Sequence, residues 1–147
     1  DVERIYKFIV GEMITIRDQV VKVNNVDYES VLQDYIDANT DKILAFTDGK
    51  IINEPHRQLT MRVDNDKDTM WISKREFDSY LADLPISTKE FVYQMRLLNI
   101  EIEVGAKVKQ RMNAGWKDVS KSATAVYKIK LSTLGAEKIE GLKNAVA

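Results

Sequence analysis

The chain has 147 residues, 44% hydrophobic and 31% charged, and a net charge of −1, which is typical of one folded domain and excludes a disordered chain. It contains no cysteine, which excludes disulfides and thiolate zinc sites. It shows neither a signal peptide nor the roughly 20 consecutive apolar residues that cross a bilayer, so we expect a cytoplasmic protein with no membrane partner.

Helices are expected at the start of the chain. Apolar residues recur at helical spacing within residues 2–13, so we expect residues 1–26 to form an N-terminal helical segment. Residues 27–147 should form a winged-helix domain that makes one compact unit with this segment. The first helix of that domain is indicated by an apolar face that consists of Tyr28, Val31, Leu32, Tyr35 and Ile36. A short apolar stretch then leads into a turn at residues 47–50.

The centre of the chain predicts a β-hairpin. Two strand-like runs, 58–64 and 69–73, flank the polar residues 65–68. Three aspartates within residues 64–68 have the spacing of the first ligands of a calcium loop. Such a loop also needs a glycine where this chain has Thr69, so we interpret the aspartates as turn residues and predict no metal site.

Two capped helices are predicted after this hairpin. Ser73 and Glu76 form a capping box, and Ser87 with Glu90 repeats it. Pro85 separates the helices because proline cannot continue the first one. The apolar stripes that should face the core consist of Phe77, Tyr80, Leu81 and Leu84 in the first helix and of Phe91, Met95 and Leu98 in the second. Two short helices joined by a tight turn are typical of a helix-turn-helix.

The remaining residues predict a long hairpin and a final helix. Residues 100–104 alternate apolar and acidic side chains as a half-buried strand does, and the strand continues to Met112. A loop and a return strand over 124–131 complete the hairpin, and residues 133–146 form an amphipathic helix. This order of elements indicates an α+β fold, a winged helix-turn-helix with extra N-terminal helices and a C-terminal helix.

Positive charge gathers on the long hairpin, because residues 104–147 carry a charge of +6 and residues 1–103 a charge of −7. Strand alternation puts Lys107, Lys109 and Arg111 on one side of their strand. Four more basic residues lie nearby in the sequence: Lys117, Lys121, Lys128 and Lys130. The aromatic residue at the tip of the hairpin is Trp116. Such cations suit the phosphate backbone of a nucleic acid, and a tryptophan at the tip can stack on an unpaired base.

Other interpretations of this hairpin remain open. The acidic and basic parts of the chain can neutralise each other within one fold. Lysine on an exposed strand also protects a sheet edge against aggregation. Trp116 can pack over its own loop instead of on a base.

A second candidate surface lies on the second capped helix. Lys89, Tyr93 and Arg96 follow each other at i, i+4 and i+7, opposite the apolar stripe, so they should face outward together. A helix face of this kind can enter the major groove of DNA, where Lys and Arg bind guanine. The alternative is an ordinary solvated face, which Glu90 beside these residues favours.

No catalytic motif accompanies these surfaces. His56 is the single histidine and has no nucleophile motif beside it, which argues against a Ser-His-Asp mechanism. Neither G-x-x-x-x-G-K-[ST] nor G-x-G-x-x-G occurs, so the chain has no phosphate-binding loop of those kinds. We therefore expect neither enzyme activity nor a cofactor.

Residues 35–131 resemble the C-terminal winged-helix region of AAA+ replicative helicases, of the helicase-primase kind, from phages, plasmids and other mobile elements. The stretches that carry the resemblance are LTMRVDNDKDTMWISKREFDSYL, ISTKEFVYQMRLLNI and KQRMNAGW. The first matches the family's R-x-(E/D)-x-(D/N)-x-x-x-(L/M)-(W/Y)-I-S hairpin. The last matches a K-R-M-x-x-G element, with Gln110 inserted, whose positions fall on Lys109, Arg111, Met112 and Gly115.

The resemblance implies a non-catalytic DNA-binding accessory domain that holds duplex or forked DNA, with weak sequence preference, against a helicase motor. The motor would lie elsewhere in a longer protein, and it or other subunits would be further partners. The main alternative is a protein–protein or oligomerisation module whose wing docks on an acidic partner. A stand-alone transcriptional regulator is a third interpretation.

Overall fold

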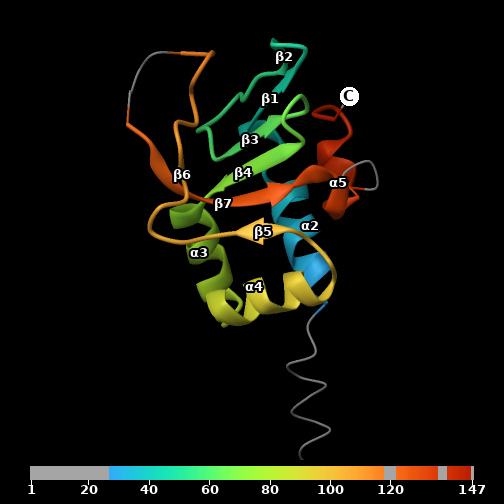
Figure 1. Cartoon of the computed structure of the whole chain (residues 1–147), viewed down its shortest axis with the longest axis vertical. Coiled ribbons are helices and arrows are strands. Elements are labelled where there is room, and N and C mark those ends of the chain that lie inside the picture. The colour runs from blue at the N-terminus through green and yellow to red at the C-terminus, as the bar shows by residue number, and fades with distance from the viewer. Residues whose placement is uncertain (1–26, 118–121, 136–138, 147) are drawn as a thin grey trace, which may run out of the picture.

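The structure is a computed structural model that describes residues 27–117, 122–135 and 139–146 (Figure 1). The N-terminal segment 1–26, which we expected to be helical, lies outside the described residues, and so does Lys121. The described residues form a seven-stranded sheet. Its strands are β1 (Ile43–Thr47), β2 (Lys50–Asn53), β3 (Met61–Asp64), β4 (Thr69–Ser73), β5 (Ile102–Glu103), β6 (Lys109–Gln110) and β7 (Thr124–Lys130).

The sheet is mixed. Its strand order is β2-β1-β3-β4-β7-β5, and β6 also pairs with β7. β1 and β3 run parallel, with Ile43 opposite Met61, whereas the other pairs are antiparallel. β7 therefore lies inside the sheet, between β4 and the edge formed by β5 and β6.

Helices cover one face of this sheet, and α3 and α4 lie below β5 and β7 in the view of Figure 1. The helical segments are α2 (Tyr28–Ala38), α3 (Lys74–Asp83), α4 (Thr88–Leu97), α5 (Leu131–Leu134) and the 3₁₀ turns Thr40–Lys42 and Glu140–Leu142. The core between helices and sheet centres on the fully buried Phe77, whose ring contacts Tyr35, Phe91 and Tyr127. All five apolar residues predicted for the face of α2 are buried.

The predicted winged helix-turn-helix is wrong, because the described residues form a large mixed sheet rather than a small helix-rich domain. Residues 43–46, which we interpreted as a short apolar stretch, and residues 47–50, which we interpreted as a turn, belong to the hairpin β1–β2. Its turn needs positive φ at Asp48 (53°) and Gly49 (71°), and the Asp66 carboxylate accepts both of their backbone N–H groups at 3.0 Å. Pairing of β1 with β3 then extends the sheet beyond β4.

The predicted C-terminal helix over 133–146 is also wrong. α5 ends at Leu134 because Gly135 adopts the left-handed conformation with φ of 64°, which terminates a helix. The last described residues form the short 3₁₀ turn Glu140–Leu142, and Leu142 packs in the main core.

The predicted hairpin and the two helices after it are confirmed, although their details differ. β3 and β4 pair as expected, and α4 begins after Ser87, whose Oγ accepts the Glu90 N–H at 3.4 Å. The Ser73 hydroxyl instead donates to the Glu76 carboxylate and caps no backbone N–H. Leu84 and Leu98, expected in the core, are exposed because each lies just past the last turn of its helix.

Candidate nucleic-acid interface

The outward face of α4 lines a shallow groove. Lys89, Tyr93 and Arg96 are all exposed, as their helical spacing predicted, while Phe91 and Met95 on the opposite face are buried. The groove has a volume of about 350 Å³. We call it the α4 groove, and it is defined by Thr88, Lys89, Val92, Tyr93 and Arg96 on one wall and by Lys74, Val104 and Tyr127 on the other.

Arg96 connects α4 to the strand that forms the far wall. Its Nη2 donates a hydrogen bond to the carbonyl oxygen of Ile102 at 3.4 Å. This contact fixes the guanidinium at the junction of α4 and β5. A guanidinium carries five N–H donors in a planar fork, so Arg96 can bind an anion while it keeps this contact.

Lys74, at the first position of α3, joins the same groove through a half-buried network. Its Nζ pairs with one carboxylate oxygen of Asp78, and the Tyr127 hydroxyl donates to the other. The ammonium also lies 5.9 Å from the centroid of the Tyr127 ring. Asp78 is therefore engaged on both oxygens, and it holds Lys74 and Tyr127 together in the same wall of the groove.

Burial raises the pKa of Tyr127 above its ordinary value of 10.0, and the hydrogen bond to Asp78 raises it further. The folded protein thus keeps a proton that the unfolded chain releases near pH 10. Because the folded pKa is the higher one, the associated stability is complete below pH 10 and is lost as the pH rises above it. Burial also raises the pKa of Tyr28, Tyr35 and Tyr80, so the effect adds over several side chains.

We expect Tyr127→Phe to change both the stability and its pH dependence. At pH 7 the lost hydrogen bond to a carboxylate should cost about 1.5–3 kcal/mol. Above pH 10 the free energy of unfolding of the variant should fall by about 1.4 kcal/mol less per pH unit than that of the parent. Urea unfolding at pH 7, 10 and 11 measures both effects. Parallel alkaline slopes for the two proteins would show that Tyr127 ionises as freely in the fold as outside it.

The continuous strand that was predicted to extend to Met112 is not formed, because β5 and β6 are two short, separate strands. β6 contains only Lys109 and Gln110, so Lys107 lies before the strand and Arg111 after it. Alternation along one strand therefore does not align the three basic residues. Lys107 and Lys109 are exposed, whereas Arg111 is half-buried and takes part in an interaction within the chain.

The other basic residues of the predicted wing are largely engaged. The Lys117 ammonium lies 4.6 Å from the centroid of the half-buried Trp116 ring, so the two residues interact with each other. Lys128 lies opposite Glu103 across the β5–β7 pair. Lys130 Nζ lies 3.9 Å from a carboxylate oxygen of Glu101.

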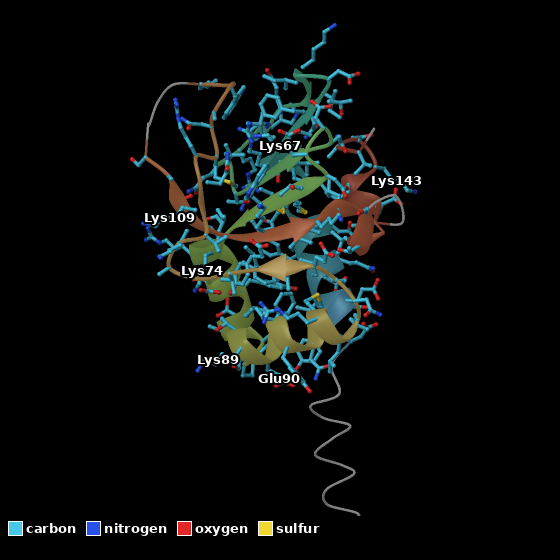
Figure 2. The ribbon with its side chains drawn as sticks, viewed as in Figure 1. Lys67, Lys74, Lys89, Glu90, Lys109 and Lys143 are labelled. Atoms are coloured by element: carbon cyan, nitrogen blue, oxygen red, sulfur yellow. The ribbon has the colours of Figure 1, made fainter. Side chains whose placement is uncertain are left out.

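Figure 2 shows that Lys109, Lys74 and Lys89 lie along one side of the molecule, whereas Lys67 and Lys143 lie near the top and on the opposite side. We define the basic side as Lys74, Lys89, Arg96 and Lys109. It combines part of the predicted helix face, part of the predicted wing and one residue that we missed. Lys74 could not be found from sequence, because only the packing of α3 beside α4 brings it to the groove.

Arg62, on β3, also escaped the sequence analysis. It is 7% exposed, and its Nη1 donates to the carbonyl oxygens of Met112 at 2.9 Å and Ala114 at 2.5 Å. Its guanidinium carbon lies 4.3 Å from the centroid of the Phe46 ring. Burial lowers the pKa of Arg62, and the nearby Asp64 opposes that shift. Arg62 thus fastens the segment after β6 to the sheet face that the helices leave open.

Packing supports this attachment. Met112 is buried against Trp71 and Val126 on the same sheet face. Gly115 has φ of 79°, a left-handed conformation that favours glycine, and its backbone lies next to the Phe46 ring. Two of the three stretches that carry the resemblance, the hairpin that contains Arg62 and the segment that contains Met112, therefore contact each other.

Comparison with protein-family models, curated proteins and solved structures finds no match to this chain. Within the described part of the chain, no helix combines the length and apolar character needed to span a bilayer. The same residues contain no cluster of three or more His, Asp or Glu side chains that could hold a metal ion.

Proposed function

We propose that this chain is a non-catalytic, cytoplasmic DNA-binding domain that contacts the phosphate backbone through its basic side. The observation that carries the proposal is the convergence of Lys74, Lys89 and Arg96 on one groove. In keeping with the sequence resemblance, its role would be to hold DNA against the motor of a mobile-element replication helicase or primase.

Asp78 neutralises Lys74 within the fold, and Glu101 and Glu103 line a neighbouring hollow with Arg96, so the positive charge that the α4 groove offers to a phosphate comes from Lys89 and Arg96. Both oxygens of Asp78 are engaged inside the fold. Glu90 faces away from the groove lining, and its carboxylate accepts a hydrogen bond from Gln94 Nε2 at 2.8 Å. Lysine and arginine side chains around an exposed groove attract phosphates and release the counterions bound to them. This interaction holds DNA without reading its sequence, which agrees with weak sequence preference.

A pair of double variants tests the proposal. Lys89→Gln with Lys109→Gln removes two charges from the basic side, and Lys67→Gln with Lys143→Gln removes two from elsewhere. Both variants have the same net charge, and the exposed ion pair of Lys143 with Glu140 that the second one breaks contributes little to stability. By fluorescence anisotropy with labelled DNA at low salt, the first should bind more weakly than the parent and the second should not. Equal affinities for the two variants would mean that the basic side is not the DNA site.

A protein partner is the second candidate, because α4 also exposes apolar side chains. Tyr93, Leu97 and Leu98 are 57%, 58% and 47% exposed. An acidic partner with an apolar surface, such as the motor of the parent protein, could cover them together with the basic side. Leu97→Ser should then weaken the complex with that partner, whereas a DNA role of the basic side alone predicts no such loss. DNA affinity should be unchanged in either case.

A further inference from the structure

The α4 groove has an apolar interior as well as a charged rim. Val92, Val104 and the ring of Tyr127 lie among its lining residues, and Tyr93 stands in its wall with 57% of its surface exposed. Phosphate binding alone needs cations and no exposed aromatic ring. A tyrosine ring exposed beside a small apolar hollow offers a face on which a flat, apolar group can stack.

We propose that the α4 groove binds one unpaired nucleotide of a single strand, with its base stacked on Tyr93 and its flanking phosphates on Lys89 and Arg96. This inference rests on the proposed DNA-binding function and specifies its substrate class. Base faces are available in a single strand, whereas in a duplex they are stacked on one another. The groove therefore favours single-stranded DNA over duplex DNA.

The spacing along α4 fits this arrangement. Lys89 and Arg96 lie seven residues apart with Tyr93 between them, which separates the two cations by about 10 Å along the helix axis. Each cation can thus reach the phosphate on its own side of the stacked base. The groove volume of about 350 Å³ is at the lower end of the range for small-ligand pockets, which suits one base and not a longer stack.

The groove is also built before a ligand arrives. The hydrogen bond from Arg96 to Ile102 and the network of Lys74, Asp78 and Tyr127 fix side chains that would otherwise have to be ordered on binding. Such ordering costs binding free energy, so a preformed groove binds more tightly than a flexible one.

The test compares a labelled oligothymidylate of about 12 nucleotides with a blunt duplex of the same length. By fluorescence anisotropy, Tyr93→Ala should weaken binding of the oligothymidylate about 5- to 100-fold and leave duplex binding nearly unchanged. Tyr93→Phe keeps the ring and should bind both DNAs as the parent does. Leu97→Ala, one turn along the same helix at a side chain of similar exposure, is the matched control and should change neither affinity.

The outcomes separate the two proposals. If the parent binds neither DNA at low salt, the proposed function fails and this inference fails with it. The second outcome is that the double variant Lys89→Gln with Lys109→Gln binds both DNAs more weakly, which supports the proposed function. If Tyr93→Ala then changes the affinity for both DNAs equally, or for neither, the single-strand site is overturned. Because Tyr93 is exposed, its variants should keep the circular dichroism spectrum of the parent.

Discussion

Phe77→Ala is expected to lower the free energy of unfolding by about 3–5 kcal/mol. Phe77 is fully buried, and its ring centroid lies 4.9 Å from that of Tyr35, 5.0 Å from Phe91 and 5.3 Å from Tyr127. These partners belong to α2, α4 and β7, so truncation opens a cavity at the meeting point of three elements. Urea unfolding at pH 7 measures the loss.

Leu84→Ala is the control for this substitution. Leu84 directly follows α3 and is 40% exposed, so its removal should change stability by no more than about 0.5 kcal/mol. A loss below 1 kcal/mol for Phe77→Ala would mean that Phe77 does not join the three elements into one core.

Arg62→Ala is expected to cost about 3 kcal/mol and to loosen the segment after β6. The substitution leaves the carbonyl oxygens of Met112 and Ala114 without their donor and removes the contact with the Phe46 ring. Urea unfolding measures the global loss. Cleavage by trypsin within residues 107–117 measures the local one, and it should become faster than in the parent.

Arg57→Ala provides the matched control. The Arg57 side chain is 69% exposed, and its Nη1 pairs with Asp41 Oδ2 at 3.4 Å on the surface. Exposed pairs contribute little, so stability and trypsin cleavage should both stay close to the parent values. If the Arg62 and Arg57 variants were cleaved at the same rate, Arg62 would not be what holds the segment to the sheet.

Local signals in the sequence predicted elements whose contacts are local. The hairpin β3–β4 and the helices α3 and α4 are specified by neighbouring turn and capping residues, and each is present. The parallel pairing of β1 with β3 joins strands separated by the whole of β2, and no local pattern reveals it. Without that pairing, residues 43–50 look like a short apolar stretch and a turn between the first helix and the β3–β4 hairpin, and the size of the sheet is underestimated.

The same difference between local and long-range contacts separates the residues of the candidate site that the sequence predicted from those that it did not. The helical period places Lys89, Tyr93 and Arg96 on one exposed face, because an exposed helix face depends only on the residues of that helix. The prediction that strand alternation aligns Lys107 and Arg111 with Lys109 was wrong. The pairing with β7 is interrupted between β5 and β6, so these residues do not lie on one continuous strand. Lys74 and Arg62 act through partners in other elements, so only the folded structure identifies them.

The salt dependence of DNA binding tests most directly whether the basic side binds phosphates. Each cation that meets a duplex phosphate contributes about 0.9 to the negative slope of log K against log salt concentration. On a blunt duplex, Lys89→Gln with Lys109→Gln should therefore make the slope shallower by about 1.8 relative to the parent. Lys67→Gln with Lys143→Gln, which removes the same charge elsewhere, should leave the slope unchanged. An unchanged slope in the first variant, or an equal change in both, would contradict the assignment of the basic side as the DNA-binding surface.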